Sequence, residues 1–430
     1  MNKTAKNRKP FYNTTVPVDW GISKFGQEFN FIKTFSFSRA QLREHKTADE
    51  IQNIHYGDIH STFENEILDF EYERPIPYLA DGLIDKDLFD DEEFPALKDG
   101  DLIIADVSED YEGICDCIEL KNVNGRKIVS GLHTFATRTD EQNISLGFRT
   151  YILKHQQVIR ELRRIATGIS VYGVSKTNLS KVNIPLPPLP EQKAIAKVLS
   201  LMDKAINKNN RLIAQKELQK KWLMQNILTG KKRLEGLSGE WKKEGAGNIF
   251  KSVSIKGNTN EELLSATQDR GIIPRTMLEG RVTMPSGNVS SFKLVGKGDF
   301  VISLRSFQGG LEYSYYKGLV SPAYTVLKPK KQIDEEFYKQ YFKSYEFIGH
   351  LAIAVIGIRD GKQISYSDFC TVKIPYPQIK EQTAIAQVLQ AADKEIALLK
   401  AKTEKLREQK KGMMQVLLTG KKRLNYDLCD

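Results

Sequence analysis

The sequence predicts an α+β protein in which two globular parts of mixed α/β structure are joined by two long helices that pack on each other as an intramolecular coiled coil. Three observations lead to this fold class: a segment that the chain contains twice, an apolar seam in each copy, and the same order of expected elements in each globular part. With 430 residues, of which 40% are hydrophobic, the chain is long enough for two or three domains with separate cores.

The repeated segment spans residues 182–234 and recurs without a gap at 372–424. Of the 53 aligned positions, 26 are identical. The shared phrases are Ile-Pro at 184 and 374, Glu-Gln at 191 and 381, and Leu-Thr-Gly-Lys-Lys-Arg-Leu at 228 and 418. A repeat on this scale indicates that the chain consists of two units of similar plan.

Each copy contains a long stretch without proline, of about 37 residues, that begins at Gln192 or at Gln382. At about 1.5 Å per residue such a helix is roughly 55 Å long, which is more than one small domain needs. Apolar residues recur along it at spacings of three and four, so that one stripe faces a partner helix. We expect packing through Ile195, Leu199, Ile206, Leu389, Ile396 and Leu399.

Both helices have matching start and stop signals. The Ile-Pro phrases open an extended lead-in, because proline cannot continue a helix. Glu191 and Glu381 then place a carboxylate at the positive start of each helix. At the far end, Gly230 and Gly420 can take the left-handed conformation that stops a helix.

The two globular parts share the order of their expected elements while their residues differ. A Gly-Asp turn leads into an apolar, β-prone run at 99–108 and again at 297–306. We expect a helix at 148–166 and another at 335–354, each followed by a loop rich in Gly and Ser. A duplicated scaffold with different loops is expected of two similar modules that read two different targets.

These patterns divide the chain into regions. No run of 18 apolar residues and no signal-peptide pattern occurs, so we expect a cytoplasmic protein without a membrane span. The expected regions are a basic, disordered leader at 1–15, a first domain at 16–181, a central constant region at 182–234, a second domain at 235–371, a C-terminal constant region at 372–424 and a tail at 425–430.

Charge is unevenly distributed along the chain. The net charge is +10, yet residues 51–120 sum to −18 and residues 121–190 to +8. The repeated helices are basic, which indicates a polyanionic partner, although solvated lysines on a coiled coil explain part of this charge. The acidic stretch must face away from phosphates or meet another protein.

Motifs of common enzyme classes are missing. The sequence has no P-loop, no Gly-x-Gly-x-x-Gly turn, no His-Glu-x-x-His and no Asn/Asp-Pro-Pro-aromatic tetrapeptide. The four cysteines, Cys115, Cys117, Cys370 and Cys429, form neither a disulfide framework nor the paired Cys-x-x-Cys pattern of a zinc site. The sequence therefore predicts a protein without a catalytic or metal site of its own.

One constellation imitates a nuclease. Asp106 or Asp110, followed by Glu119 and Lys121, has the spacing of a Mg²⁺ site in which two carboxylates hold the metal. The pattern is short, lies in a crowded acidic stretch and has no counterpart in the second globular part. A solvated acidic face is the preferred interpretation.

The repeat also resembles a known family. The phrases Ile-Pro-Leu-Pro-Pro-Leu-Pro-Glu-Gln at 184–192 and Ile-Pro-Tyr-Pro-Gln-Ile-Lys-Glu-Gln at 374–382, the helices after them and the two Leu-Thr-Gly-Lys-Lys-Arg-Leu stops resemble the DNA-specificity (S) subunits of type I restriction–modification enzymes. The resemblance covers the chain from end to end as variable part, constant helix, variable part, constant helix.

The resemblance implies a fold and a function. In that family each variable part is a target-recognition domain that reads one half of a split double-stranded DNA site. The constant helices pair antiparallel, set the distance between the half-sites and dock two methyltransferase subunits, which a restriction/translocase subunit joins. The S subunit is not catalytic, so S-adenosylmethionine, Mg²⁺ and ATP would belong to partner subunits.

Candidate DNA contacts follow from loop position and side-chain type, because Arg, Lys, Asn, Gln and Ser read base edges and bind phosphates. For each candidate an ordinary solvated loop residue is the alternative. In the first variable part the candidates are Arg138, Tyr172, Ser175 and Lys176. In the second they are Arg305, Ser306, Gln308, Arg359, Lys362 and Tyr366.

The leading hypothesis is thus a sequence-specific DNA-binding subunit that recruits a modification methylase. The alternative is a standalone coiled-coil DNA-binding adaptor, or a docking scaffold, without a role in restriction.

Overall fold

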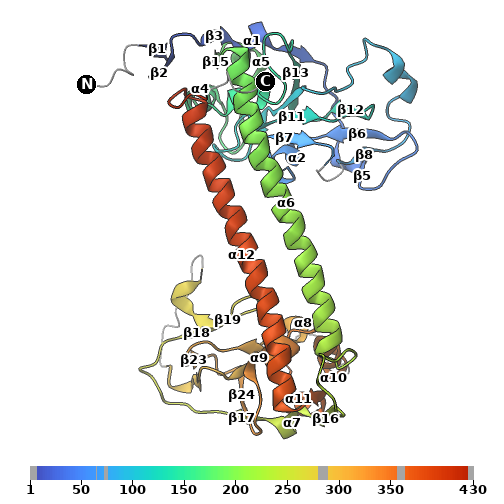
Figure 1. Ribbon diagram of the computed structural model, residues 1–430, viewed down its shortest axis with the longest axis vertical. Coiled ribbons are helices and arrows are strands. Elements are labelled where there is room, and N and C mark those ends of the chain that lie inside the picture. Colours follow the sequence, from blue (N-terminus) through green and yellow to red (C-terminus); the bar gives the residue numbers. More distant parts are fainter. Residues whose placement is uncertain (1–6, 64, 72–75, 279–288, 356–363, 425–430) are drawn as a thin grey trace. The chain divides into compact units, whose positions relative to one another are not determined.

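The computed structural model divides into two compact units (Figure 1). The first unit contains residues 1–210 and 402–430, and the second contains residues 211–401. Each unit therefore combines one globular part with half of each long helix. The structure describes residues 7–63, 65–71, 76–278, 289–355 and 364–424.

The two long helices are α6 (Leu189–Ile227) and α12 (Ile379–Leu417), each of 39 residues. They begin three residues earlier than the sequence predicted. In the first unit the amino-terminal half of α6 lies beside the carboxyl-terminal half of α12 (Figure 1), where Leu199 and Leu417 share one apolar core. In the second unit the other two halves meet in the same way, through Ile227 and Leu389.

Ion pairs between the two repeated segments give the direction of the helices in each unit. They are Glu191–Arg423 and Asp203–Lys410 in the first unit, and Lys220–Asp393 and Arg233–Glu381 in the second. As residue numbers rise along the first segment they fall along the other. The helices are antiparallel in both units, and the predicted fold class is confirmed.

The glutamate of the repeated Glu-Gln phrase binds the stop segment of the other repeat. Buried Glu191 accepts a hydrogen bond from Trp20 Nε1 at 2.9 Å and one from Arg423 Nε at 2.5 Å. In the second unit buried Glu381 accepts two hydrogen bonds from the Arg233 guanidinium, one of them from Nη2 at 2.7 Å. The identical residues thus build the same joint twice.

The glutamine of the phrase ties the helix start to the globular part. The Gln192 side chain accepts a hydrogen bond from the Ser145 backbone N–H at 2.9 Å, and that of Gln382 accepts one from Asp334 N–H at 2.9 Å. Each amide also donates to a carbonyl of its own lead-in at 2.8 Å. These contacts, together with those of the glutamate, explain why the Glu-Gln phrase recurs in the second copy.

The glycines of the stop segments have the predicted left-handed backbone, with φ of +73° at Gly230 and +60° at Gly420. A Cβ at Gly420 would lie 2.5 Å from Pro17 and 3.1 Å from the Trp20 ring. A Cβ at Gly230 would lie 3.0 Å from the Trp241 ring. Each stop segment therefore packs closely on the segment that opens a globular part.

The first globular part contains a five-stranded sheet in the order β4-β13-β9-β11-β7. In β9, Leu102 and Ile104 belong to one core, and Ile103 and Ala105 to another. Both faces of the sheet are covered, so this run has no polar alternation. The strands are β4 (Asn30–Ile32), β7 (Ile67–Asp69), β9 (Leu102–Ala105), β11 (Cys117–Lys121) and β13 (Thr134–Arg138).

A second sheet, in the order β12-β6-β8-β5, packs on one face of the first through Ile54 and Ile128. Helices, including the start of α6, cover the other face. The strands are β5 (Leu42–Arg43), β6 (Ile51–Ile54), β8 (Tyr78–Leu79) and β12 (Lys127–Ser130). The short helices are α1 (Phe25–Glu28), α2 (Tyr56–Ser61), α5 (Lys176–Ser180), and the 3₁₀ turns η2 (Arg39–Gln41) and η3 (Lys86–Asp90).

The expectation of one helix at 148–166 and one at 335–354 is wrong, because each is broken into two. The first is α3 (Arg149–Leu153) and α4 (Gln156–Ile165), and the second is α9 (Glu335–Tyr341) and α10 (Tyr345–Val355). At the breaks, His155 Nδ1 accepts a hydrogen bond from Gln157 N–H at 3.1 Å, and Ser344 Oγ accepts one from Phe347 N–H at 3.3 Å. A side chain that caps a new helix start favours the break.

The expectation of a disordered leader is wrong for residues 8–15. β1 (Arg8–Phe11) pairs antiparallel with β2 (Thr14–Pro17), and Phe11 is buried in the core of the first unit. Arg8 Nη1 donates a hydrogen bond to the Gly420 carbonyl at 2.9 Å. The burial of Phe11 and the hydrogen bond from Arg8 to Gly420 order this segment. Residues 1–6 lie outside the described residues.

The second globular part contains a sheet in the order β17-β24-β21-β22, which packs on α9, α10 and α12 through Phe250, Phe342 and Leu389. The strands are β17 (Phe250–Val253), β21 (Phe300–Ile302), β22 (Glu312–Tyr313) and β24 (Thr325–Pro329). Paired strands beside it are β18 (Leu264–Thr267) with β19 (Gly271–Pro274), and β20 (Lys293–Val295) with β23 (Gly318–Val320). The short helices are α7 (Ala246–Ile249), α8 (Ser306–Gly309), α11 (Tyr366–Thr371), and the 3₁₀ turns η4 (Arg275–Met277) and η5 (Val289–Ser291).

Each proline lead-in is extended, as predicted, and pairs with a strand near the start of its own globular part. β15 (Asn183–Leu186) pairs with β3 (Gly21–Lys24), and β25 (Lys373–Tyr376) pairs with β16 (Lys242–Gly245). Both pairs are antiparallel. The start and the end of each globular part thus meet where a long helix begins.

Candidate nucleic-acid interface

A short hairpin of the first unit, closed by the antiparallel bridge between Thr167 and Gly173, carries part of the predicted DNA-contact set. β14 (Tyr172–Gly173) pairs antiparallel with β10 (Val107–Ser108). Thr167 and Gly173 exchange two backbone hydrogen bonds of 2.9 and 2.8 Å, which close the loop between them. A Cβ at Gly168 would lie 1.8 Å from the Val171 carbonyl oxygen, so this tight loop requires glycine.

Tyr172, Ser175 and Lys176 lie together at this hairpin. The rings of Tyr172 and Tyr111 are 4.3 Å apart between centroids. Ser175 caps α5 with its hydroxyl, which explains this serine by local structure. Lys176 is exposed, and its Nζ lies 5.5 Å from the centre of the Phe31 ring. The hairpin therefore presents an aromatic ring and a cation to solvent.

Sequence reasoning missed a group of rings beside the hairpin. The Tyr56 ring makes edge contacts with His60 and His133, at centroid distances of 6.1 and 5.4 Å. His133 Nδ1 lies 3.3 Å from Asp106 Oδ1, and the Asp106 carbonyl accepts a hydrogen bond from Val174 N–H at 3.0 Å. These residues are spread between positions 56 and 133 of the sequence and form no recognisable motif. Only the fold brings them together.

The charges of this group depend on pH. The hydrogen bond to Asp116 raises the pKa of the His60 imidazole, although burial opposes this. Burial raises the pKa of the Asp106 carboxyl, and the nearby His133 opposes the shift. Both carboxylates have an imidazole beside them, which lowers their repulsion of a phosphate when the imidazole is protonated.

Arg138 lies at the far end of β13 from this hairpin. Its Nε and Nη2 donate to the two carboxylate oxygens of Asp101, each at 2.7 Å, and Nη2 also donates to the Ala96 carbonyl at 2.9 Å. The Asp101 side chain is fully buried, and its hydrogen bonds raise the pKa of Arg138. Arg138 thus holds the Gly-Asp turn, and its role as a DNA contact stays a prediction.

The second unit presents Arg305 and Gln308 at the start of α8. Both side chains are exposed. Ser306, between them, is fully buried, and its Oγ accepts a hydrogen bond from Ser303 N–H at 2.8 Å. This hydrogen bond explains Ser306 by the local turn, and its role as a DNA contact stays a prediction.

The remaining candidates of the second unit lie before its proline lead-in. Tyr366 is half-buried at the start of α11 and donates its hydroxyl to the Phe250 carbonyl at 3.0 Å. This bond assigns the ring an anchoring role. Arg359 and Lys362 lie outside the described residues.

The residues expected in the helix seam differ in burial and in the core to which they belong. The two ends of the seam are buried in the cores of the globular parts, where Ile195 and Leu199 belong to the first unit and Leu389 to the second. Of the other seam residues, Ile206 and Ile396 are buried, and Leu399 is half-buried.

The nuclease-like residues are not assembled into a site. Glu119 pairs with Leu102 in the antiparallel register, so Asp106 lies four residues further along β9 and β10. At about 3.3 Å per residue the two carboxylates are roughly 13 Å apart along the strands. The Lys121 ammonium binds Asp69 at 3.0 Å. Within the described ranges, no three His, Cys, Asp or Glu side chains are grouped to hold a metal.

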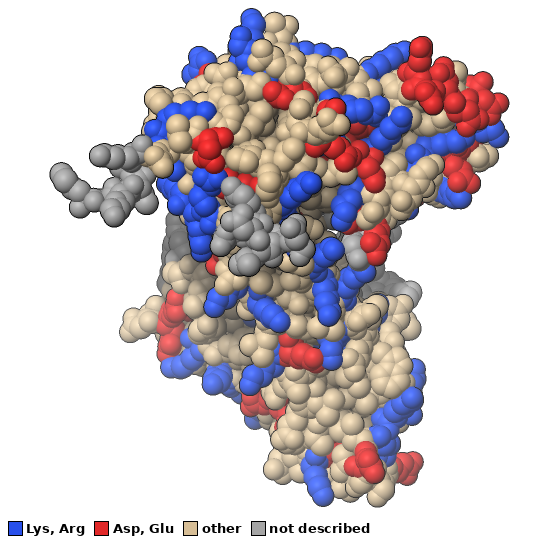
Figure 2. Space-filling view, turned by 45° about the horizontal axis from the view of Figure 1, so that its top comes forward, with Lys and Arg blue, Asp and Glu red and all other residues tan. Residues whose placement is uncertain are grey.

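The acidic stretch forms a patch of its own. Figure 2 shows Asp and Glu side chains gathered at one edge of the first unit, while Lys and Arg are spread over the rest of that face. Phosphates are repelled by such an edge. The exposed carboxylates around η3 are Asp85, Asp87, Asp90, Asp91, Glu92 and Glu93.

Comparison with known proteins supports the family resemblance that the repeat indicated. The family described as type I restriction modification DNA specificity domain matches residues 84–217 and 247–408. The chain is 25% identical over 464 residues to the type I restriction enzyme MjaVIII specificity subunit of Methanocaldococcus jannaschii, covering 98% of each chain. It is 27% identical over 321 residues to the putative MjaX specificity subunit of the same organism, covering 69% of this chain and 73% of that one.

A solved structure has the same fold. The S subunit of a type I restriction–modification system from M. genitalium has a TM-score of 0.53 and 14% sequence identity, over 96% of this chain and 98% of that one. In the described part of this chain, no helix is both long and apolar enough to span a bilayer. Since the matched segments make up more than half of its residues, the chain belongs to the family of type I restriction modification DNA specificity domains.

Proposed function

We propose that this chain is the DNA-recognition subunit of a type I restriction–modification complex, and that each globular part reads one half of an interrupted, asymmetric site. The recognition domains would be residues 16–181 and 235–371. Family membership and the duplicated plan support this proposal. So do the exposed Lys176 of the first unit and the exposed Arg305 of the second, which are suited to phosphates or base edges.

One observation carries the proposal. The same joint is built twice, by Glu191 with Arg423 and by Glu381 with Arg233, while the globular parts on these joints have different sheets and different exposed loops. A fixed frame with two unlike surfaces suits a protein that holds two unlike half-sites. Symmetric half-sites would need two identical surfaces.

The long helices would set the distance between the half-sites. Both are continuous over 39 residues, which at about 1.5 Å per residue gives roughly 58 Å. DNA contacts carried by such helices can lie more than one helical turn of DNA apart, since a turn is about 35 Å. The spacer of the site would therefore follow from helix length.

The helices would also dock two methyltransferase subunits, which a restriction/translocase subunit joins. In this proposal the chain is not catalytic, and S-adenosylmethionine, Mg²⁺ and ATP are bound by its partners. The separation of Asp106 from Glu119 is consistent with this division of labour.

Co-expression tests the proposal. The chain should form a stable complex with an adenine methyltransferase subunit from the same genome, and sequencing of methylated adenine should reveal one split, asymmetric motif. Exchange of residues 235–371 for those of a relative should change one half of that motif only. A chain that binds DNA without a methyltransferase and leaves methylation unpatterned would instead be a standalone adaptor.

A further inference from the structure

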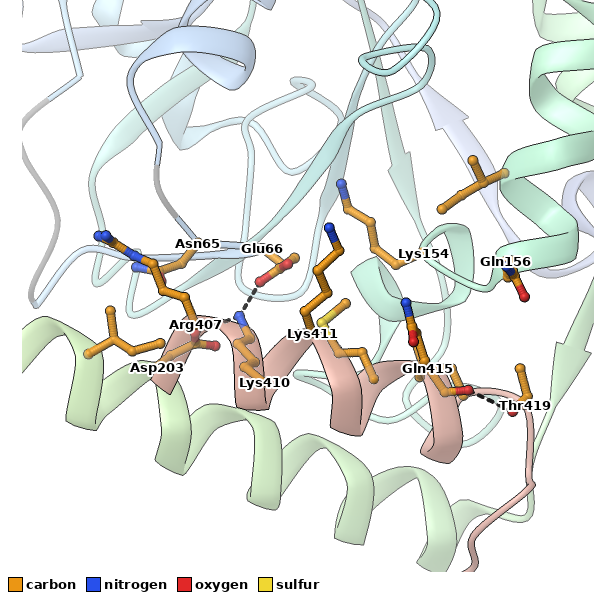
Figure 3. Close-up of a pocket in the computed structure, with 14 residues that line it drawn as sticks. Asn65, Glu66, Lys154, Gln156, Asp203, Arg407, Lys410, Lys411, Gln415 and Thr419 are labelled. Atoms are coloured by element: carbon orange, nitrogen blue, oxygen red, sulfur yellow. Dashed lines mark hydrogen bonds and ion pairs between the residues drawn. The ribbon is translucent and has the colours of Figure 1, made fainter. Parts of the chain in front are cut away.

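The first unit contains a pocket between its globular part and the two long helices (Figure 3). Its volume is about 430 Å³. Lys154 and Ile159 line it from the globular part, and Lys411, Met414 and Gln415 line it from α12. It is a concave site outside the hairpin that carries the proposed DNA contacts.

The second unit contains a pocket at the equivalent place, with a volume of about 830 Å³. Lys343 and Ile348 line it from the globular part, and Lys221, Met224 and Gln225 line it from α6. Thr419 and Thr229 complete the two sets. Seven equivalent positions line both pockets, and six of them carry the same residue; at the seventh, Gln156 of the first pocket corresponds to Tyr345 of the second.

This identity is unusual for the globular parts. When residues 149–162 are aligned with 338–351, three of the fourteen positions are identical. Two of these are the lysine and the isoleucine that line the pockets. The third is the pair Leu162 and Leu351, which are buried in the cores of their units. In this stretch, the retained residues outside the cores are those that line the pockets.

The pocket of the first unit has a closed charge network at its base. Lys410 is 8% exposed in its side chain and pairs with Glu66 and with Asp203, the latter at 2.5 Å (Figure 3). Lys154 Nζ pairs with Asp116 at 2.7 Å. In the second unit the equivalent pair is Lys220–Asp393, at 2.5 Å. The cations at the base are therefore already neutralised.

The cations at the rim are not neutralised. Lys411 and its equivalent Lys221 are exposed, and neither has an acidic partner in the described part of the chain. Beside them, Met414 and Met224 are half-buried and supply an apolar wall. A ligand that complements these walls carries a carboxylate next to an apolar side chain.

A protein segment fits these features better than DNA does. Met414 and Ile159 line the first pocket with apolar atoms, which an apolar side chain of a protein covers and a phosphate does not. The rim of the second pocket carries Tyr345, 82% exposed, and Trp222, 47% exposed. Such rings are typical anchors of protein interfaces.

We infer that the two pockets are docking sites for one and the same acidic segment with an apolar side chain, supplied once by each of two copies of a partner polypeptide. The residues retained in both pockets favour like occupants in both units. The inference rests on the proposed function in one respect, which is that the partner is taken to be the methyltransferase subunit.

Charge reversal at the rim tests the inference. The double variant Lys221→Glu/Lys411→Glu should lose the methyltransferase subunit, with affinity lowered at least about tenfold at each site. Each single variant should retain one bound copy. Native mass spectrometry of the co-expressed complex gives the stoichiometry, and circular dichroism verifies folding.

The matched control is Lys204→Glu/Lys394→Glu, which reverses two exposed, repeat-equivalent lysines on the same helices outside both pockets. It should bind two copies, as the unaltered chain does. A second arm, Met224→Ala/Met414→Ala, removes the apolar wall without a change of charge and should also weaken binding.

The outcomes separate the two levels of inference. If the unaltered chain binds no methyltransferase subunit, the proposed function fails. If it binds two and the rim variants bind two equally well, the docking inference fails while the proposed function stands. If the rim variants bind the subunit normally but lose affinity for double-stranded DNA, the pockets are phosphate sites and the inference is overturned.

Discussion

Glu119 is a buried carboxyl whose charge state changes near neutral pH. It is 1% exposed and accepts hydrogen bonds from the Gly147 N–H at 2.5 Å and the Thr150 N–H at 3.3 Å. Burial raises its pKa to about 7, and these hydrogen bonds oppose the shift without cancelling it. Between pH 4.5 and 7 the folded protein therefore retains a proton that the unfolded chain has released.

The free energy of unfolding should consequently fall as pH rises through this window and be constant above it, with a loss of at most about 3 kcal/mol from this residue. In the Glu119→Gln variant, which cannot ionise, this contribution should vanish. Urea unfolding at pH 5 and pH 8 measures it as the difference between the two proteins. Parallel pH profiles would contradict the assignment, and Glu92→Gln, at an exposed site, is the control.

The candidate DNA contacts show what a residue type reveals and what it conceals. Lys176 and Gln308 are exposed, as their residue types indicated, although they lie in the short helices α5 and α8 and not in loops. Arg138 and Ser306 have equally suitable side chains, yet one is bound to Asp101, 37 residues away, and the other is enclosed in its own turn. Side-chain type reports what a residue can bind, while its actual partner depends on the fold.

At the scale of elements, the stop segment after α12 is held by contacts with the first globular part. Arg423 binds Glu191 and also Asp19, at 2.8 Å through Nη2. Glu191 is 1% exposed, and its carboxylate accepts hydrogen bonds from Arg423 and from the Trp20 indole. The equivalent stop segment after α6 packs on Trp241, which follows it within a few residues along the chain.

Arg423→Ala should destabilise the first unit by about 2 kcal/mol, because it leaves a buried carboxylate without its cation. Lys421→Ala, two residues away at an exposed position, should change stability by less than about 0.5 kcal/mol. Thermal or urea unfolding compares the two. Equal effects would show that the joint between the repeats contributes nothing specific.

Two glycines of the C-terminal repeat should respond in opposite directions to the same change. Gly420→Ala introduces a Cβ at φ +60° and against Pro17, which should cost at least about 1 kcal/mol. Gly412→Ala, within α12 and facing open space, should stabilise by about 0.5–1 kcal/mol through helix propensity. Unfolding curves of the two variants provide the check, and a shift of the same sign in both would contradict it.

At the scale of the whole molecule, both units depend on one register of the two helices. Insertion of seven residues after Asn210 and seven after Ala401 keeps the pairs of each unit together and retains the face of each helix, since seven residues are close to two turns. It adds about 10 Å, so the spacer of the DNA site should lengthen by about three base pairs.

The same insertion after Asn210 alone should abolish site-specific methylation, because the pairs of both units can no longer form together. Sequencing of methylated adenine distinguishes the double insertion from the single insertion. An unchanged spacer in the double insertion would separate helix length from half-site spacing and refute that part of the proposed function.

The sequence by itself determined the elements that repeat. A gapless copy fixes the length of both helices, their glycine stops and their extended lead-ins, because these depend on local propensity and on spacing along the chain. The breaks before α4 and α10 were missed, since apolar periodicity continues through a capping side chain.

Only the tertiary structure decided how distant residues meet. It brought Glu191 to Arg423, 232 residues away, and gathered Tyr56, His60 and His133 into one group. It also placed Lys154 beside Lys411, and Lys343 beside Lys221, in two like pockets. Such contacts are set by packing between segments far apart in sequence, and no local pattern encodes which side chains will share a core, an ion pair or a pocket.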